Sequence, residues 1–148
     1  MTLPAIPDAA IQLAATALDW RAAVELVGAG LTRSGAAEPG YADEMIRMIE
    51  EHGPYVVIAP GLALAHARPG PEVLRDGLAV VTLATPVPFG HPHNDPVLVV
   101  LGLAVHSPDH HLGMVAELAN IFNDSDAVER LAVASSADQV RDILGAGV

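Results

Sequence analysis

The spacing of apolar positions predicts two helices in the first third of the chain. Apolar side chains recur three or four positions apart from Asp19 to Arg33, and again from about Pro39 or Tyr41 to His52. This period places apolar side chains on one side of an α-helix. Asp19 is a suitable N-cap for the first helix, and the Gly-Pro pair after His52 would end the second.

Runs of apolar and β-branched residues predict the strands. They occupy residues 55–59, 62–65, 78–83 and 97–105. Pro86 would close the third strand. The fourth run is apolar on both faces, which is typical of a central strand covered by helices on both sides. Residues 10–13 alternate weakly, and they form either a short edge strand or a loosely ordered tail.

Three further helices are predicted in the last third of the chain. The first begins at residues 107–109, which read Ser-Pro-Asp. Its inner face would carry Leu112, Val115, Leu118, Ala119 and Phe122. A short helix follows, capped by Asp124 or Ser125, and a last helix is capped by Ser135 or Ser136.

The order of these elements predicts a single α/β domain. Helices and strands alternate without an internal repeat, which favours a sheet with helices layered against it. The 148 residues have the length of one ordinary domain, and 51% of them are hydrophobic, so a buried core can form. We therefore assign residues 1–148 to one domain.

Composition excludes several kinds of chemistry. The chain has no cysteine, which excludes disulfides, thiolate metal sites and cysteine nucleophiles. All seven positive charges are arginines, so neither a Schiff-base lysine nor a P-loop lysine is present. The formal net charge of -11 argues against nucleic acid and against an anionic membrane surface as partners.

The hydropathy of the chain predicts no membrane insertion. The longest apolar run, residues 97–105, is far shorter than the roughly 20 residues of a spanning helix. The first positive charge is Arg21, so no secretory signal pattern opens the sequence. We expect a soluble cytoplasmic protein, and the apolar excess makes a homodimer plausible.

One histidine stands out because of its neighbours. Residues 53–69 read GPYVVIAPGLALAHARP, so that His66 ends an apolar run and Arg68 follows it closely. A neutral imidazole can attack phosphorus, and its ordinary pKa of about 6.5 makes that form available near neutral pH. The guanidinium of Arg68 could pair with phosphoryl oxygens. From these residues alone, a buried structural histidine is an equally good interpretation.

A second candidate pair lies at the start of the helix that follows the central strand. Ligands of open α/β sheets gather at the carboxyl ends of strands, and helix N-termini favour anions. His111 precedes the apolar stripe of this helix and is expected to lie along the sheet. His110 is expected to cap the helix or face solvent.

The remaining histidines carry weaker signals. His91 and His93 with Asp95 could bind zinc or nickel, although a polar turn with incidental histidines explains them better. A metal-binding module would combine His91 and His93 with the pair at 110 and 111. We interpret His52 and His106 as structural.

Three motifs together resemble a known family. They are residues 53–69, residues 94–97, which read NDPV, and the His-Leu pair at 111–112. In this order and at this spacing the chain resembles the enzyme IIA domains of the mannitol/fructose class of the bacterial phosphoenolpyruvate-dependent sugar phosphotransferase system. The resemblance covers nearly the whole chain and implies a mixed β-sheet sandwiched between helices.

The resemblance also implies a function. His66 matches the histidine that accepts a phosphoryl group from phospho-HPr and passes it to an enzyme IIB. His111 matches a second active-site histidine that positions the phosphoryl group. No metal or organic cofactor is implied. A regulatory phosphoprotein, which uses the same histidine without feeding a transporter, is the alternative.

Two positions depart from the mannitol branch of the family. Pro60 stands where that branch has a glutamate, and Met48 stands where it has an arginine. The residues Ala-Pro-Gly before His66 and Ala-Arg-Pro after it are more similar to the ascorbate-type branch.

Overall fold

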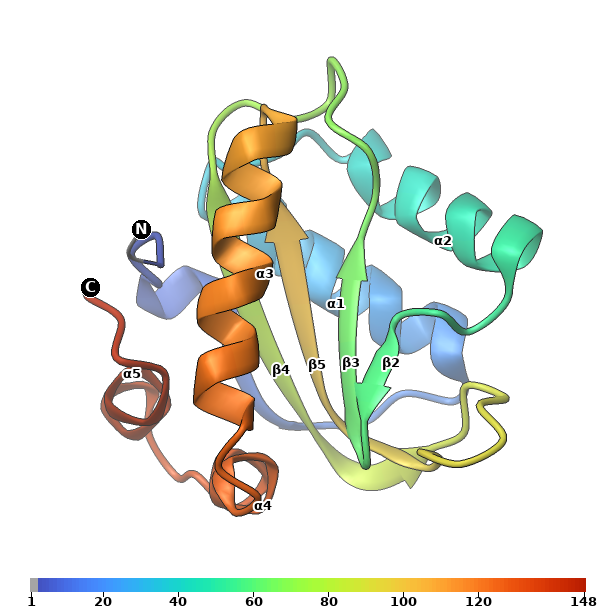
Figure 1. Cartoon of the computed structure of the whole chain (residues 1–148), viewed down its shortest axis with the longest axis vertical. Coiled ribbons are helices and arrows are strands. Elements are labelled where there is room, and N and C mark those ends of the chain that lie inside the picture. The colour runs from blue at the N-terminus through green and yellow to red at the C-terminus, as the bar shows by residue number, and fades with distance from the viewer. Residues whose placement is uncertain (1–2) are drawn as a thin grey trace.

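A five-stranded mixed sheet forms the centre of the molecule in the computed structural model, which describes residues 3–148 (Figure 1). Its strands, in chain order, are β1 (Ile11–Ala15), β2 (Val57–Ala59), β3 (Leu62–His66), β4 (Gly77–Val87) and β5 (Val97–Ala104). Their spatial order is β1-β4-β5-β3-β2. At one edge β2 runs antiparallel to β3, and at the other edge β1 runs parallel to β4. In the middle, β5 runs antiparallel to β4 and parallel to β3. The predicted mixed sheet is confirmed.

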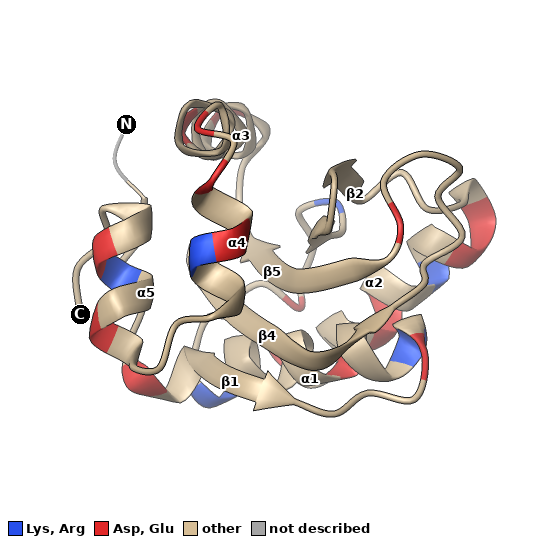
Figure 2. Ribbon diagram, turned by 90° about the horizontal axis from the view of Figure 1, so that it is seen from below, with Lys and Arg blue, Asp and Glu red and all other residues tan. Residues whose placement is uncertain are grey.

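Helices cover both faces of this sheet (Figure 2). The helices α1 (Trp20–Arg33) and α2 (Gly40–His52) pack against each other on one face. The helices α3 (Pro108–Phe122) and α4 (Ala127–Ala132) lie on the other face, and α5 (Ala137–Leu144) lies near the N-terminal segment and its short 3-10 helix η1 (Asp8–Ala10). No helix of the described residues is long and apolar enough to cross a bilayer.

The central strand is buried as its apolar sequence predicts. Every residue of β5 except Leu98 is buried. Gly102 allows α1 to approach this strand closely, because a Cβ atom at that position would lie 2.8 Å from a methyl carbon of Val27. The core therefore extends without interruption from α1 through the sheet.

Most helix starts follow the predicted caps. The Asp19 carboxylate accepts a hydrogen bond from the Ala22 N–H, and the Ser136 hydroxyl accepts one from the Gln139 N–H. The start of α4 differs from the prediction, since its N-cap is Asp126 and not Asp124 or Ser125. Asp124 instead accepts a hydrogen bond from the backbone N–H of Asp126.

Two strand predictions differ in their extent. Of residues 10–13, Ala10 ends η1 and the other three belong to an edge strand, β1, and not to a loose tail. The strand β4 does not end before Pro86 but continues to Val87. Its pairing with β5 shifts register between Thr82 and Val87. A proline is tolerated at such a bulge because its missing N–H interrupts no regular ladder.

The inner face of α3 was predicted wrongly in part. Leu112 is 69% exposed, whereas Met114 and Leu118 are the buried residues of this helix. The stripe that faces the sheet begins at His111 and continues at positions three and four further on, so Leu112 lies about 100° around the helix from it. The apolar side chain of Leu112 is thereby left at the surface beside His111.

Candidate functional site

The topology of the sheet brings His66 and His111 together. His66 is the last residue of β3 and pairs with Leu103 on the parallel strand β5. The chain leaves the carboxyl end of β5 and enters α3 at the same end of the sheet as His66. His111 lies in the first turn of that helix. The centroids of the two imidazole rings are 5.1 Å apart. Two residues that lie 45 positions apart in the sequence therefore share one site.

The backbone of β3 fixes the tautomer of His66. Its Nδ1 atom lies 2.8 Å from the carbonyl oxygen of Leu64. A carbonyl oxygen can only accept a hydrogen bond, so Nδ1 carries the hydrogen and Nε2 carries the lone pair. The lone pair is the part of the ring that can act as a nucleophile.

Burial keeps the half-buried His66 ring uncharged. Loss of solvent lowers the pKa of His66, the hydrogen bond to the Leu64 carbonyl raises it, and the nearby His111 lowers it again. The net shift is below the ordinary value, so His66 is neutral at neutral pH.

Tyr55 supports the other side of the His66 ring. The two rings meet edge to face, with centroids 5.4 Å apart and an interplanar angle of 89°. The Tyr55 hydroxyl donates a hydrogen bond of 3.3 Å to the carbonyl oxygen of His66. The imidazole is therefore held between an aromatic ring and His111, and it cannot swing freely.

A buried tyrosine on α2 anchors the segment that follows His66. The Tyr41 hydroxyl donates to the carbonyl oxygen of Leu103 at 2.7 Å and accepts from the N–H of Ala67 at 3.0 Å. Burial raises its pKa to about 12. From the sequence, Tyr41 was named as a possible start of this helix. A buried tyrosine hydroxyl needs a hydrogen-bond partner, and that requirement was the available signal.

His111 presents a different tautomer. Its Nδ1 atom is buried, and no described residue forms a hydrogen bond with it. A buried N–H without a partner costs more than a lone pair without one, so the hydrogen belongs on Nε2. His111 can therefore donate a hydrogen bond to a ligand that lies beside His66.

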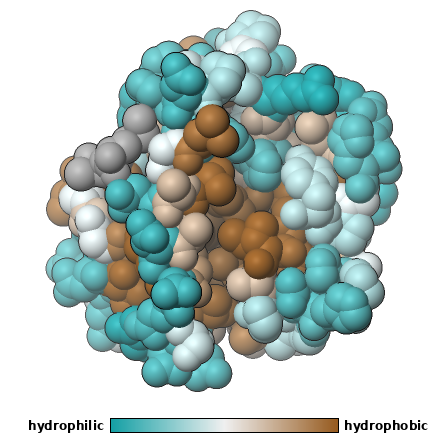
Figure 3. Space-filling view, in the orientation of Figure 1, coloured by the Kyte–Doolittle hydropathy of each residue, from teal (hydrophilic) through white to brown (hydrophobic). Residues whose placement is uncertain are grey.

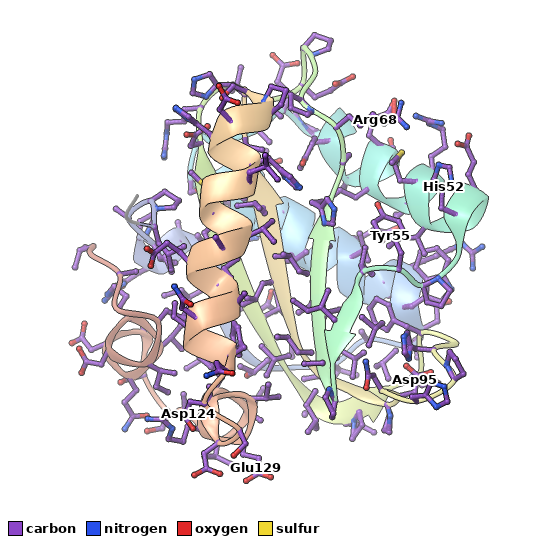
Figure 4. All side chains as sticks on the ribbon, in the orientation of Figure 1. His52, Tyr55, Arg68, Asp95, Asp124 and Glu129 are labelled. Atoms are coloured by element: carbon purple, nitrogen blue, oxygen red, sulfur yellow. The ribbon has the colours of Figure 1, made fainter. Side chains whose placement is uncertain are left out.

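A cleft of about 760 Å³ opens over both histidines. Its walls include Tyr55, Arg68, Leu112 and Met48. Tyr55 and Arg68 lie on the α2 side of the end of β3 (Figure 4). The Arg68 side chain is exposed and makes no ion pair within residues 3–148. Figure 3 shows apolar atoms around the hollow beside α3.

The N-terminus of α3 adds favourable electrostatics. Ser107 caps the helix, and its hydroxyl accepts a hydrogen bond from the N–H of His110. Pro108 occupies the first turn, where a missing N–H does no harm. The positive end of the helix dipole lies at His111 and favours an anionic ligand there.

The loop at residues 88–96 lies at the opposite end of the sheet, as the positions of Asp95 and Arg68 show (Figure 4). The Asp95 carboxylate accepts hydrogen bonds from three successive backbone N–H groups, those of residues 89–91. His91 Nδ1 accepts from the N–H groups of His93 and Asn94. These groups build the loop, as the turn interpretation predicted.

The proposed four-histidine metal module does not form among the described residues. His91 and His93 lie in the loop at the far end, and His111 packs against His66. His110 contacts Asp76 instead. The four rings do not converge on one point.

The two positions that depart from the mannitol branch lie in different places. Met48 is partly buried and lines the cleft over His66. Pro60 is exposed in the turn between β2 and β3, which lies at the other end of β3 from His66. Only the change at Met48 thus alters the surroundings of the histidine pair.

Comparison with known proteins identifies the family. Residues 5–146 match the family described as "Phosphoenolpyruvate-dependent sugar phosphotransferase system, EIIA 2". The chain belongs to this family. It is thus a phosphotransferase-system component, a relay protein that carries phosphoryl groups, and the predicted family is confirmed.

Relatives of known name and structure agree with this assignment. The chain is 35% identical over 135 residues to the ascorbate-specific PTS system EIIA component of Shigella boydii, which covers 90% of this chain and 88% of the relative. It is 27% identical to nitrogen regulatory protein IIA-Ntr from Neisseria meningitidis, with a TM-score of 0.80 and coverage of 93% and 94%. Mannitol enzyme IIA from Escherichia coli, solved in complex with phosphorylated enzyme IIB, shares the fold at 24% identity, with a TM-score of 0.85 and coverage of 97% and 99%.

Proposed function

We propose that His66 accepts a phosphoryl group on Nε2 from phospho-HPr and passes it to an enzyme IIB. The observation that carries this proposal is the position of two imidazoles, with ring centroids 5.1 Å apart, under one open cleft. His66 offers a lone pair, and His111 offers an N–H, over one open cleft. A nucleophile with a hydrogen-bond donor beside it is the arrangement that phosphoryl transfer requires.

The transfer balances without an external base. The Nε2 lone pair of His66 forms the new N–P bond while the N–P bond to the donor histidine breaks. The electron pair of the broken bond returns to the donor ring. The hydrogen on Nδ1 of His66 stays in place, and its bond to the Leu64 carbonyl stabilises the positive charge that develops on the ring.

Three groups can hold the phosphoryl oxygens in this proposal. His111 donates from Nε2, and the N-terminus of α3 contributes its dipole. The guanidinium of Arg68 lines the same cleft and can form two parallel hydrogen bonds to a phosphoryl group. Catalysis then consists of positioning and charge stabilisation, which suffices for this reaction class.

The surroundings of the cleft fit docking of an acceptor protein. Leu112 is 69% exposed and adjoins the cleft, so that apolar contact can seal the site against water. Since the chain carries a net charge of -11, we infer that local apolar contact and Arg68, and not the overall charge, guide the partner. The likeness to ascorbate-specific relatives supports an ascorbate-type enzyme IIB as the acceptor. We also propose the cytoplasm as the site of action.

Labelling from phospho-HPr tests the proposal. The purified protein is incubated with enzyme I, HPr and phosphoenolpyruvate, and the phosphorylated residue is mapped by mass spectrometry at alkaline pH. We expect one phosphoryl group on His66, no label in His66→Ala, and normal label in the control His93→Ala. Full labelling of His66→Ala, or a label on another residue, would refute the assignment.

A regulatory role is the second candidate, because the chain is also similar to a nitrogen regulatory IIA protein. Transfer from the phosphorylated protein to an ascorbate-type enzyme IIB separates the two roles. Rapid transfer supports the transport relay. A stable phosphoprotein that no enzyme IIB discharges supports regulation.

A further inference from the structure

A second pair of histidines lies beside the start of α3, turned away from His66. His106 Nδ1 is 2.6 Å from one carboxylate oxygen of Asp76, and His110 Nδ1 is 2.5 Å from the other. The centroids of these two rings are 5.0 Å apart. The phosphoryl-transfer site uses none of these three side chains.

Two elements of the fold hold the three residues together. Asp76 directly precedes β4, and His106 and His110 flank the N-cap of α3, four positions apart. The backbone N–H of His106 also donates to Asp76, at 3.1 Å. The first residue of β4 pairs with the last residue of β5, so the antiparallel sheet places the carboxylate beside the helix start.

We propose that Asp76, His106 and His110 bind one divalent transition-metal ion, with Zn²⁺ as the reference ion. Each residue offers a ligand atom, and the three atoms lie within 4.8 Å of one another. Two imidazoles and one carboxylate are ligands that zinc, nickel and copper bind readily, and sites with three protein ligands leave a position for water. The sequence interpretation treated His106 as structural, and the metal module that it considered combined His110 with His91, His93 and His111.

The geometry requires only a small adjustment. Zinc–nitrogen bonds of about 2.0–2.1 Å place the ligand atoms of a tetrahedral site roughly 3.3 Å apart. The present separations of 2.6 and 2.5 Å, each to a different carboxylate oxygen, must therefore open by less than about 1 Å. Ligand atoms that now lie further apart, at most 4.8 Å, must close by less than about 2 Å. The His106 and His110 side chains are 55% and 41% exposed and are free to move by that amount.

Protons and charges also balance. In the structure each Nδ1 lies at hydrogen-bond distance from an Asp76 oxygen and therefore carries a hydrogen, which must leave when the metal binds that nitrogen. In a neutral ring this hydrogen moves through solvent to Nε2, and a doubly protonated ring releases it as a proton. The Asp76 carboxylate supplies the negative charge that offsets both the cation and the positive end of α3. Binding must therefore weaken as the pH falls.

The metal site is separate from the phosphoryl site. His110 and His111 are neighbours in the sequence, but His110 contacts Asp76 and His111 contacts His66. Binding of the ion thus needs neither phosphorylation nor the cleft. The proposal is independent of the proposed function, and it can fail while that function stands.

Metal titration of the full chain, with any affinity tag removed, tests the proposal. We expect saturable 1:1 binding of Zn²⁺ by calorimetry, and a visible absorption band from Co²⁺ in the same site. Asp76→Asn, His106→Gln and His110→Gln should each weaken binding by at least about tenfold, since even residues that only orient a metal ligand contribute about 10- to 100-fold. The controls His66→Gln and the double variant His91→Gln/His93→Gln should bind as the wild type does.

Two results would overturn the proposal. One is the absence of saturable binding by the wild-type protein. The other is binding that survives in His106→Gln but is lost in His66→Gln or in the double variant. Circular dichroism of each variant verifies folding, and His106→Gln, at the most exposed of the three positions, remains informative if Asp76→Asn does not fold.

Discussion

The start of α3 separates two histidine pairs that have opposite environments. His66 and His111 lie half-buried in a cleft without a carboxylate, and burial lowers the pKa of His66. The His106 side chain is exposed, the His110 side chain is partly exposed, and both contact Asp76. Burial raises the pKa of Asp76, but hydrogen bonds from the two histidines outweigh it and keep the carboxylate ionised. The first pair is suited to nucleophilic attack, and the second is suited to holding a cation.

This difference shows that residue type alone does not define a histidine's role. His110 and His111 are adjacent in sequence and lie in the same helical turn, yet they point to different neighbours. A nucleophile needs an uncharged ring with a free lone pair, which burial and the Leu64 carbonyl provide. A carboxylate beside the ring would favour the charged form and remove that lone pair.

The largest expected difference is between alanine substitutions of the adjacent residues His110 and His111. We expect His111→Ala to slow phosphoryl transfer from phospho-HPr by about 10²-fold, because one preorganised donor to the phosphoryl oxygens is lost. We expect His110→Ala to leave the rate within about twofold, because that ring faces Asp76. Quenched-flow measurement of the phosphoprotein gives both rates. Equal losses in the two variants would show that the pairs do not differ in function.

The next prediction concerns Tyr41, which anchors the segment that follows His66. Tyr41→Phe leaves the Leu103 carbonyl and the Ala67 N–H without their partner, so we expect the free energy of unfolding to fall by about 1–3 kcal/mol. The matched control is Tyr55→Phe, which removes only a bond of 3.3 Å at a partly exposed hydroxyl. Its cost should stay at about 1 kcal/mol or less. Urea unfolding measures both values, and a larger loss in the control would contradict the assigned role of Tyr41.

The smallest expected effect is on the pH dependence of the phosphoryl-transfer rate. Attack on phosphorus requires the neutral ring, and the pKa of His66 lies below its ordinary value of about 6.5. The transfer rate should therefore hold as the pH falls through 6.5 and decline only below it. Nitrogen-15 NMR titration of the His66 ring measures the pKa itself. A midpoint above 6.5 would mean that solvent reaches the ring and that burial does not tune it.

The order of elements along the chain was sufficient to predict where the site lies. Apolar runs located β3 and β5, and Ser107 marked the start of α3, so that His66 and His111 could each be placed near the end of a strand. Local patterns carry this information because each element forms from its own periodicity and caps. That the two histidines act together was implied only by the resemblance to the enzyme IIA family.

Features that depend on contacts between distant segments were missed. The hydrogen bonds of Tyr41 join α2 to β5, and Asp76 meets His106 only because β4 and β5 are antiparallel. No local pattern encodes these contacts. The orientation of Leu112 was also mispredicted, because the buried stripe begins at His111, whereas the apolar pattern began it at Leu112.

The site of the new N–P bond tests the central claim most directly. Nitrogen-15 and phosphorus-31 NMR of the protein, labelled in its histidine rings and phosphorylated by HPr, distinguishes the two ring nitrogens. The Leu64 carbonyl holds the hydrogen on Nδ1, so the phosphoryl group should be found on Nε2 of His66, with Nδ1 still protonated. A phosphoryl group on Nδ1 of His66, or on either nitrogen of His111, would contradict the account.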